Sequence, residues 1–141
     1  MRGFDSTGLV FFTNYSSCKG EQLAENPNAA VCFWWWELQQ QVRIEGRVER
    51  VSPAESDDYF YSRPEESRRA SAASPQSQVI ASREELERAA AESDGKRPVN
   101  WGGFRLAPTL FEFWQGRTAR LHDRFRYRKE DGVWVIERLA P

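Results

Sequence analysis

The sequence predicts a mostly β protein, an antiparallel barrel with helices laid around it. The first observation is the alternation of apolar and charged residues over 41–51, because successive side chains of a strand point to opposite faces. Two further runs, 8–14 and 29–36, are apolar, rich in β-forming residues and flanked by turn residues, which predicts buried strands. Glu130-Asp131-Gly132, between two C-terminal runs, is a hairpin signal.

Helices are indicated by capping residues and stop signals. Ser16 and Ser17 precede good helix formers and Asn26-Pro27 ends them, which predicts a helix between the first two strands. A short helix is expected over 53–62. The stretch that follows, 63–78, is rich in Ser, Ala, Arg and Pro, and we expect it to be an irregular surface loop.

The C-terminal half adds one helix and the remaining strands. Ser82 and Glu85 form an S-x-x-E capping box, which predicts a helix through about Glu92. Gly46, in the middle of an alternating strand, predicts a bend or bulge. Further strands are expected over 104–106, 110–115, 121–128 and 133–139. Because strands outnumber helices, we expect a single β-barrel domain over 1–141.

Composition argues against several classes of protein. The net charge of −1 argues against a general binder of nucleic acid or anionic membranes. No apolar run reaches membrane-spanning length and the first residues lack the layout of a signal peptide, so a cytoplasmic location is expected. Cys18 and Cys32 belong to no Cys/His cluster with metal-ligand spacing, so neither a metal site nor a disulfide is expected.

Two clusters in the first half of the chain have the chemistry of anion sites. Lys19 follows a strand that runs into a helix start carrying hydroxyls, where free N–H groups and the helix dipole favour an anion. An ordinary N-cap beside a solvated lysine remains the alternative. Tyr59, Arg63 and Ser67 are four residues apart, a spacing that places side chains on one helix face and suits a phosphate. A helix end with an exposed arginine is the alternative there.

The third cluster follows Trp114 and contains the single histidine of the chain. In an extended segment Arg120, His122 and Arg124 lie on the same face, so two guanidinium groups flank the imidazole. Such a surface can hold a phosphate and leave the imidazole facing a substrate. A structural histidine and a basic nucleic-acid strip are the alternatives. Sequence motifs of hydrolases, P-loops and dinucleotide-binding proteins are absent from the sequence.

Taken together, the segments of this chain resemble the pyridoxamine/pyridoxine 5′-phosphate oxidase family in order and spacing. The segments are VFFTNYSSCKG, NPNAAVCFWW, QQVRIEG, YFYSRPEES, QSQVIASR, WGGFRLAP, EFWQGRTARLHDRF and the terminal RLAP. The resemblance implies an antiparallel split β-barrel with FMN bound at a homodimer interface. It also implies oxidation of pyridoxamine or pyridoxine 5′-phosphate to the aldehyde, pyridoxal 5′-phosphate, with O₂ as the electron acceptor.

The resemblance also assigns roles by position. Contacts to FMN, several of them from the opposite subunit, fall to Phe12, Thr13, Lys19, Gln41, Gln76, Ser77, Trp114 and Arg124. The substrate-binding positions are Arg2, Tyr59, Arg63, Ser67, Arg120 and His122. Among these, Tyr59, Arg63 and Ser67 resemble the clamp for the substrate phosphate. Arg120 and His122, the catalytic candidates, resemble the pair that holds the substrate ring against the flavin.

The sequence departs from the family pattern at three places. The family has a helix and the opening barrel strands, with an Arg-x-Val-Leu-Leu-Lys segment, ahead of the point where this chain starts. We therefore expect an N-terminally truncated barrel that binds FMN poorly unless dimerisation closes the gap. Arg2 stands where the lysine of that segment would be. Cys18 replaces an arginine, and 68–73 (RRASAA) replaces a stretch that carries Gly and Trp.

Two other functions are compatible with the resemblance. One is a related flavin oxidase acting on another substrate, such as a phenazine precursor. The other is a non-catalytic homologue that binds FMN or pyridoxal phosphate. Retention of the phosphate-clamp residues and Arg120 favours a phosphorylated pyridine as the substrate.

Overall fold

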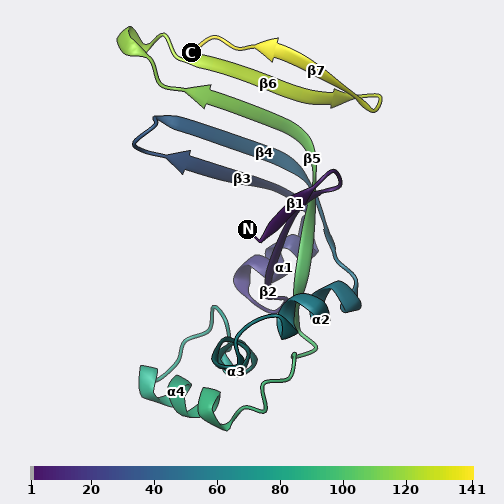
Figure 1. The fold of residues 1–141 in the computed structure, drawn as a ribbon, viewed down its shortest axis with the longest axis vertical. Helices are drawn as coiled ribbons and strands as arrows, with labels where there is room; N and C mark the ends of the chain where they lie inside the picture. The colour runs from purple at the N-terminus through teal and green to yellow at the C-terminus, as the bar shows by residue number, and fades with distance from the viewer. Residues whose placement is uncertain (1) are drawn as a thin grey trace.

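The computed structural model describes residues 2–141, which form one bent antiparallel sheet of seven strands with helices at one end (Figure 1). The strands are β1 (Gly3–Asp5), β2 (Gly8–Asn14), β3 (Asn28–Trp35), β4 (Gln40–Arg50), β5 (Trp101–Gln115), β6 (Asp123–Glu130) and β7 (Val133–Arg138). The helices are α1 (Cys18–Glu25), α2 (Pro53–Tyr61), α3 (Glu65–Ala73), α4 (Arg83–Glu92) and the short 3₁₀ helix η1 (Thr118–Arg120). The mostly β, antiparallel class predicted from the sequence is confirmed.

The long strand β5 organises the sheet. Along one edge it pairs with β4 over nearly its whole length. Along the other edge its first part pairs with β2 and its last part with β6, which continues into β7. The strand order β1-β2-β5-β4-β3 does not return on itself within the described residues, so the sheet is an open barrel wall.

A bulge at Gly46 bends the sheet, as the sequence predicts. The register between β4 and β5 shifts between Glu45 and Gly46, opposite Pro108. A Cβ atom at position 46 would lie 2.1 Å from the Ala107 carbonyl oxygen, so only glycine fits this close approach. The bulge also explains how β5 tolerates Pro108, which has no N–H to donate to the ladder.

The buried core lies where β5 is flanked by β2 and β4. Its members are Leu9, Ile44, Val48, Phe104 and Leu106. Leu106 is completely buried, and each such side chain stabilises the fold by about 1.5–3 kcal/mol relative to an exposed one. Because β2 contributes to this core, the strand that precedes Lys19 is held rigidly.

Local signals in the sequence identify most boundaries correctly. Ser17, Ser52 and Ser82 cap α1, α2 and α4, each accepting a backbone hydrogen bond in the first helical turn. In the β6–β7 hairpin, Asp131 and Gly132 both have positive φ, as a two-residue type I′ turn requires.

Several predicted elements are wrong in detail. The stretch 63–78 is not irregular throughout, because 65–73 form α3. The strands predicted over 104–106 and 110–115 are one strand, β5. The strand predicted over 121–128 begins only at Asp123.

Two further differences concern strands near the N-terminal half. The short strand β1 was not predicted. It forms because the backbone of residues 3–5 pairs with β2, and the Arg2 backbone N–H donates to the Val10 carbonyl. The strand predicted as buried over 29–36 alternates between half-buried and exposed residues, with Trp34 and Trp35 exposed. Its outer edge has no pairing strand among residues 2–141. Within the same residues, no helix is long and apolar enough to cross a membrane.

Candidate functional site

Three aromatic rings stack where β2, α2 and β5 meet. The three centroids form a triangle, with Phe12 4.0 Å from Tyr59 and 5.5 Å from Trp101, and Tyr59 6.2 Å from Trp101. The rings are within 22° of parallel. The stack places Phe12 and Tyr59, expected contacts of flavin and substrate respectively, beside each other.

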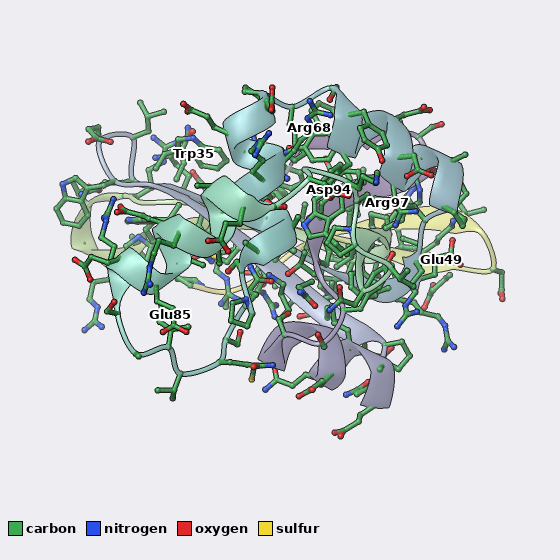
Figure 2. All side chains as sticks on the ribbon, turned by 90° about the horizontal axis from the view of Figure 1, so that it is seen from below. Trp35, Glu49, Arg68, Glu85, Asp94 and Arg97 are labelled. Carbon is green, nitrogen blue, oxygen red and sulfur yellow. The ribbon has the colours of Figure 1, made fainter. Side chains whose placement is uncertain are left out.

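Arg97 fixes the orientation of this aromatic stack. Its Nε donates to Asp57 Oδ1 of α2 at 2.6 Å, and its Nη1 donates to the Trp101 carbonyl at 2.8 Å. Figure 2 shows the Arg97 side chain among the residues beneath the sheet. The hydrogen bond and charge of Arg97 hold the pKa of Asp57 below its ordinary value, so the pair stays ionised at neutral pH. The sequence analysis did not single out Arg97.

Gln76 links the loop after α3 to the end of β2. Its Oε1 accepts hydrogen bonds from Thr13 Oγ1 at 2.7 Å and from the Asn14 backbone N–H at 3.1 Å. Thr13 is buried, with 2% of its surface exposed. Since both bonds go to the carbonyl oxygen, the Gln76 amide nitrogen keeps its two N–H donors for a ligand. Ser77 follows in a left-handed conformation, exposed at the surface.

Two of the three residues expected to clamp the substrate phosphate line one hollow beside Trp101. Arg63 and Ser67 line a hollow of about 350 Å³ together with Gln76 and Trp101. Arg63 lies between α2 and α3, where its Nη2 donates to the Ser67 carbonyl at 3.0 Å and its guanidinium carbon lies 5.5 Å from the Trp101 ring centroid. Tyr59 does not line this hollow but stacks against Trp101.

Lys19 lies at a second, larger hollow beside β2. This hollow of about 850 Å³ is lined by Arg2, Lys19, Phe11 and Phe12 among others, with Glu25 as an acidic lining residue. The Lys19 ammonium lies 5.9 Å from the Phe11 ring centroid. The Arg2 guanidinium lies 5.8 Å from the Tyr59 ring, which brings Arg2 next to the stack of Phe12, Tyr59 and Trp101.

Most of the cations expected to bind anions have no carboxylate partner. Among the ion pairs of residues 2–141, none involves Arg2, Lys19, Arg63 or Arg120. Their positive charges are therefore available to a bound anion. Arg124 differs, because Glu112 neutralises it.

A separate group of candidate residues gathers at the far end of β5. Gln41 of β4 and Arg124 of β6 are both register partners of Trp114, and the His122 ring lies 4.8 Å from the Trp114 indole. The Arg117 backbone N–H donates to His122 Nδ1 at 3.1 Å. Because Nδ1 accepts this bond, the proton of the neutral imidazole is on Nε2.

The predicted alternation of Arg120, His122 and Arg124 along one strand is wrong. Arg120 ends η1, and both Ala119 and Arg120 have positive φ, at 54° and 61°. The left-handed backbone turns the chain away from extended geometry until β6 begins at Asp123. A non-glycine residue in the left-handed conformation is strained, and such residues are found most often at functional sites. Arg120 therefore stays a candidate site residue.

Glu112 is a functional candidate that sequence reasoning missed. Only 4% of its surface is exposed, and it accepts hydrogen bonds from Arg43 and Arg124 at 2.9 and 2.8 Å. Burial alone would raise the pKa of Glu112, but the two guanidinium groups outweigh burial and hold its pKa below the ordinary value. The sequence contained one signal for this role, since Glu112 is a charged residue within the otherwise apolar and aromatic run LFEFW.

One chain therefore presents two half-sites at opposite ends of the sheet (Figure 1). Trp101 marks the lower half-site and Trp114 the upper one, both on β5. They are thirteen residue steps apart along β5, which corresponds to about 43 Å of strand. The two groups cannot contact the same small ligand within one copy.

The fold and the half-sites define a class of protein, split β-barrels whose two ends carry aromatic rings and positively charged side chains able to bind an anion. The comparisons with known proteins place the chain within that class. The family described as "Pyridoxamine 5'-phosphate oxidase" matches residues 1–96. The "Pyridoxine 5'-phosphate oxidase C-terminal dimerisation region" matches 101–141. The chain belongs to the pyridoxine/pyridoxamine 5′-phosphate oxidase family of oxidoreductases.

Relatives and solved structures agree with this membership. The chain is 55% identical to a pyridoxine/pyridoxamine 5′-phosphate oxidase of Microcystis aeruginosa over all of its length and 70% of the relative. It is 58% identical to one of an Acidovorax species, over 68% of that relative. The structure of PhzG from Burkholderia lata, in complex with tetrahydrophenazine-1-carboxylic acid, superposes with a TM-score of 0.92 at 33% identity, covering 99% of this chain and 71% of PhzG.

A more distant structure shares the fold. It is a pyridoxamine 5′-phosphate oxidase-related, FMN binding protein from Nostoc punctiforme, with a TM-score of 0.80 at 23% identity. The superposition covers 99% of this chain and 77% of that protein. The split-barrel fold predicted from the sequence is confirmed by these neighbours.

Proposed function

We propose that two copies of this chain form an FMN-dependent oxidase that converts pyridoxamine or pyridoxine 5′-phosphate to pyridoxal 5′-phosphate with O₂. The observation that carries the proposal is the hollow at Trp101. There Arg63, without a carboxylate partner among the described residues, and Ser67 border a space of about 350 Å³ next to an aromatic stack. A phosphorylated aromatic ring matches both features, and the family's relatives are named for that substrate.

The residues present fit FMN at the larger hollow. Lys19 and Arg2 offer unpaired positive charge for its phosphate, and Phe11 and Phe12 offer apolar surface for its ring system. Gln76 lines the neighbouring smaller hollow, and its free amide N–H groups there match the carbonyl oxygens of a flavin. Bound FMN would supply the acceptor for a hydride from the substrate carbon.

A homodimer explains the division into two half-sites. Since one copy keeps Trp101 and Trp114 apart, a complete site needs the lower half-site of one copy and the upper half-site of another. The upper half-site lies entirely within the matched dimerisation region apart from Gln41. This supports an active site shared between subunits.

In the shared site, the protein's part is binding and orientation. Arg63 and Ser67 hold the phosphate end of the substrate through charge and hydrogen bonds, and Tyr59 offers its stacked ring beside them. Arg120 and His122 of the partner subunit face the other end of the ring, where His122 Nε2 donates a hydrogen bond because Nδ1 is occupied by the Arg117 N–H. The two ends fix the substrate carbon at one position.

The test is turnover by purified protein supplied with FMN and pyridoxamine 5′-phosphate. Pyridoxal 5′-phosphate is followed by its absorbance and hydrogen peroxide by a coupled assay, and both should appear in equal amounts. Flavin binding without turnover would instead identify a non-catalytic homologue. A protein that binds neither ligand would contradict the proposal.

The match to PhzG supports a second candidate, oxidation of a reduced phenazine precursor. Such a substrate has no phosphate, so Arg63 and Ser67 would have no anion to bind. Hydrogen peroxide release with tetrahydrophenazine-1-carboxylic acid in place of pyridoxamine phosphate distinguishes the candidates. We expect faster turnover of the phosphorylated pyridine.

A further inference from the structure

Glu112 lies between two arginines in the middle of the sheet. It occupies β5, and its neighbours Arg43 and Arg124 come from β4 and β6. Arg124 Nε donates to Glu112 Oε1 at 2.8 Å, and its Nη2 lies 2.8 Å from the same oxygen as an ion pair. Arg43 Nη2 donates to Oε2 at 2.9 Å. The two oxygens of one buried carboxylate are therefore divided between two strands.

Arg124 is held from a second side by the C-terminal segment. Its Nη1 donates to the Ala140 carbonyl at 3.0 Å, and its own carbonyl accepts from the Leu139 N–H at 3.0 Å. A free arginine side chain loses up to about 2 kcal/mol of conformational entropy when a ligand orders it. In Arg124 this ordering is complete before a ligand arrives, and Nη1 and Nη2 each keep an N–H for one.

We propose that Glu112 is a positioning residue that fixes the Arg124 guanidinium toward FMN. The proposal rests on the proposed function, since FMN is the ligand expected at Arg124. A carboxylate with 4% exposure is a costly means of holding three strands together, because an apolar residue of similar volume packs there without a desolvation penalty. The cost is explained when the carboxylate orients a binding residue beside Trp114 and His122.

The comparison with Glu137 supports a specific role. Glu137 of β7 also binds two arginines, Arg126 and Arg128, but its side chain is 31% exposed and neither arginine is a candidate site residue. It is a matched control, because it has the same chemistry on the same sheet. Removing its charge tests what an ion-pair network alone contributes.

The relevant variants leave the other charges compensated. In Glu112→Gln, Arg43 keeps Glu45, and Arg124 is 31% exposed and can be hydrated. In Arg124→Leu, Glu112 keeps Arg43. Neither change creates a buried charge without a partner, so both proteins should fold. Circular dichroism and thermal melting check this.

The test is a double-mutant cycle read by FMN dissociation constants from quenching of flavin fluorescence. We expect Glu112→Gln and Arg124→Leu each to weaken FMN binding by about tenfold, as loss of charge-assisted hydrogen bonds does. In the double variant the two effects should not add, because Glu112 acts through Arg124. Glu137→Gln should remain within about twofold of the unchanged protein.

Two results would overturn this role for Glu112. One is unchanged affinity in Glu112→Gln, and the other is full additivity in the double variant. Glu112→Asp keeps the charge on a shorter side chain, so it should retain part of the affinity and serves as the test if Glu112→Gln does not fold. An unchanged protein that does not bind FMN would refute the proposed function itself, a separate result.

Discussion

Replacing Arg63 by glutamine tests the phosphate clamp directly. The substitution removes the positive charge and the hydrogen bond from Nη2 to the Ser67 carbonyl. A hydrogen bond to a charged group contributes about 1.5–3 kcal/mol, and because Arg63 is partly exposed the lower end applies, which is about tenfold in affinity. Since the phosphate is remote from the reacting carbon, Arg63 binds it equally strongly in the ground state and in the transition state.

The assay is steady-state oxidation of pyridoxamine 5′-phosphate. KM should rise about tenfold and kcat should stay nearly constant, the signature of lost uniform binding. Arg88→Gln, on an exposed residue of α4, is the control and should change neither constant. An unchanged KM in Arg63→Gln, or an equal loss in kcat with KM constant, would refute the clamp.

Three further predictions concern stability and pH. Leu106→Ala should lower the free energy of unfolding by about 2–5 kcal/mol in urea titrations, because Leu106 is fully buried; a loss under about 1 kcal/mol would contradict the described core. Gly46→Ala should destabilise by about 1–3 kcal/mol, since its Cβ would collide with the Ala107 carbonyl; an unchanged midpoint would argue against the bulge. Hydrogen bonds from Thr7 lower the pKa of Asp5 from 3.8 to about 2, so its contribution to stability is present above pH 3.8 and is lost as the pH falls through about 2. Asp5→Asn should therefore reduce the melting temperature at pH 6 and converge with the unchanged protein near pH 2, whereas parallel curves would contradict that pKa.

Elements with local signals could be predicted from the sequence. The serine caps of α1, α2 and α4, the turn at Asp131-Gly132 and the bulge at Gly46 each depend on neighbouring residues or on one backbone conformation. Pro108 misled the prediction of β5, because a proline is tolerated there only where the register with β4 shifts, which leaves Thr109 of β5 without a register partner. The helix α3 begins directly after Pro64 with no side-chain cap, so it has no such signal.

The candidate site was predictable in its members but not in their arrangement. Spacing brought Arg63 and Ser67 together correctly, since both flank the start of one helix. The alternation that grouped Arg120 with His122 failed, because two left-handed residues interrupt the strand. Glu112 binds Arg43 and Arg124, which are far from each other in the sequence. These contacts depend on the register of three strands, which the sequence analysis did not predict.

The central claim is that each active site combines the lower half-site of one copy with the upper half-site of another. The direct test mixes two impaired proteins, one carrying Arg63→Gln with Tyr59→Phe and one carrying His122→Asn with Arg120→Gln, under conditions that exchange subunits. Activity is read at a substrate concentration well below KM, where the rise in KM expected of Arg63→Gln lowers the rate about tenfold. Random exchange gives heterodimers with one intact site, so activity should recover to about a quarter of that of the unchanged protein. Activity that stays at the average of the two impaired proteins would show that each site lies within a single copy.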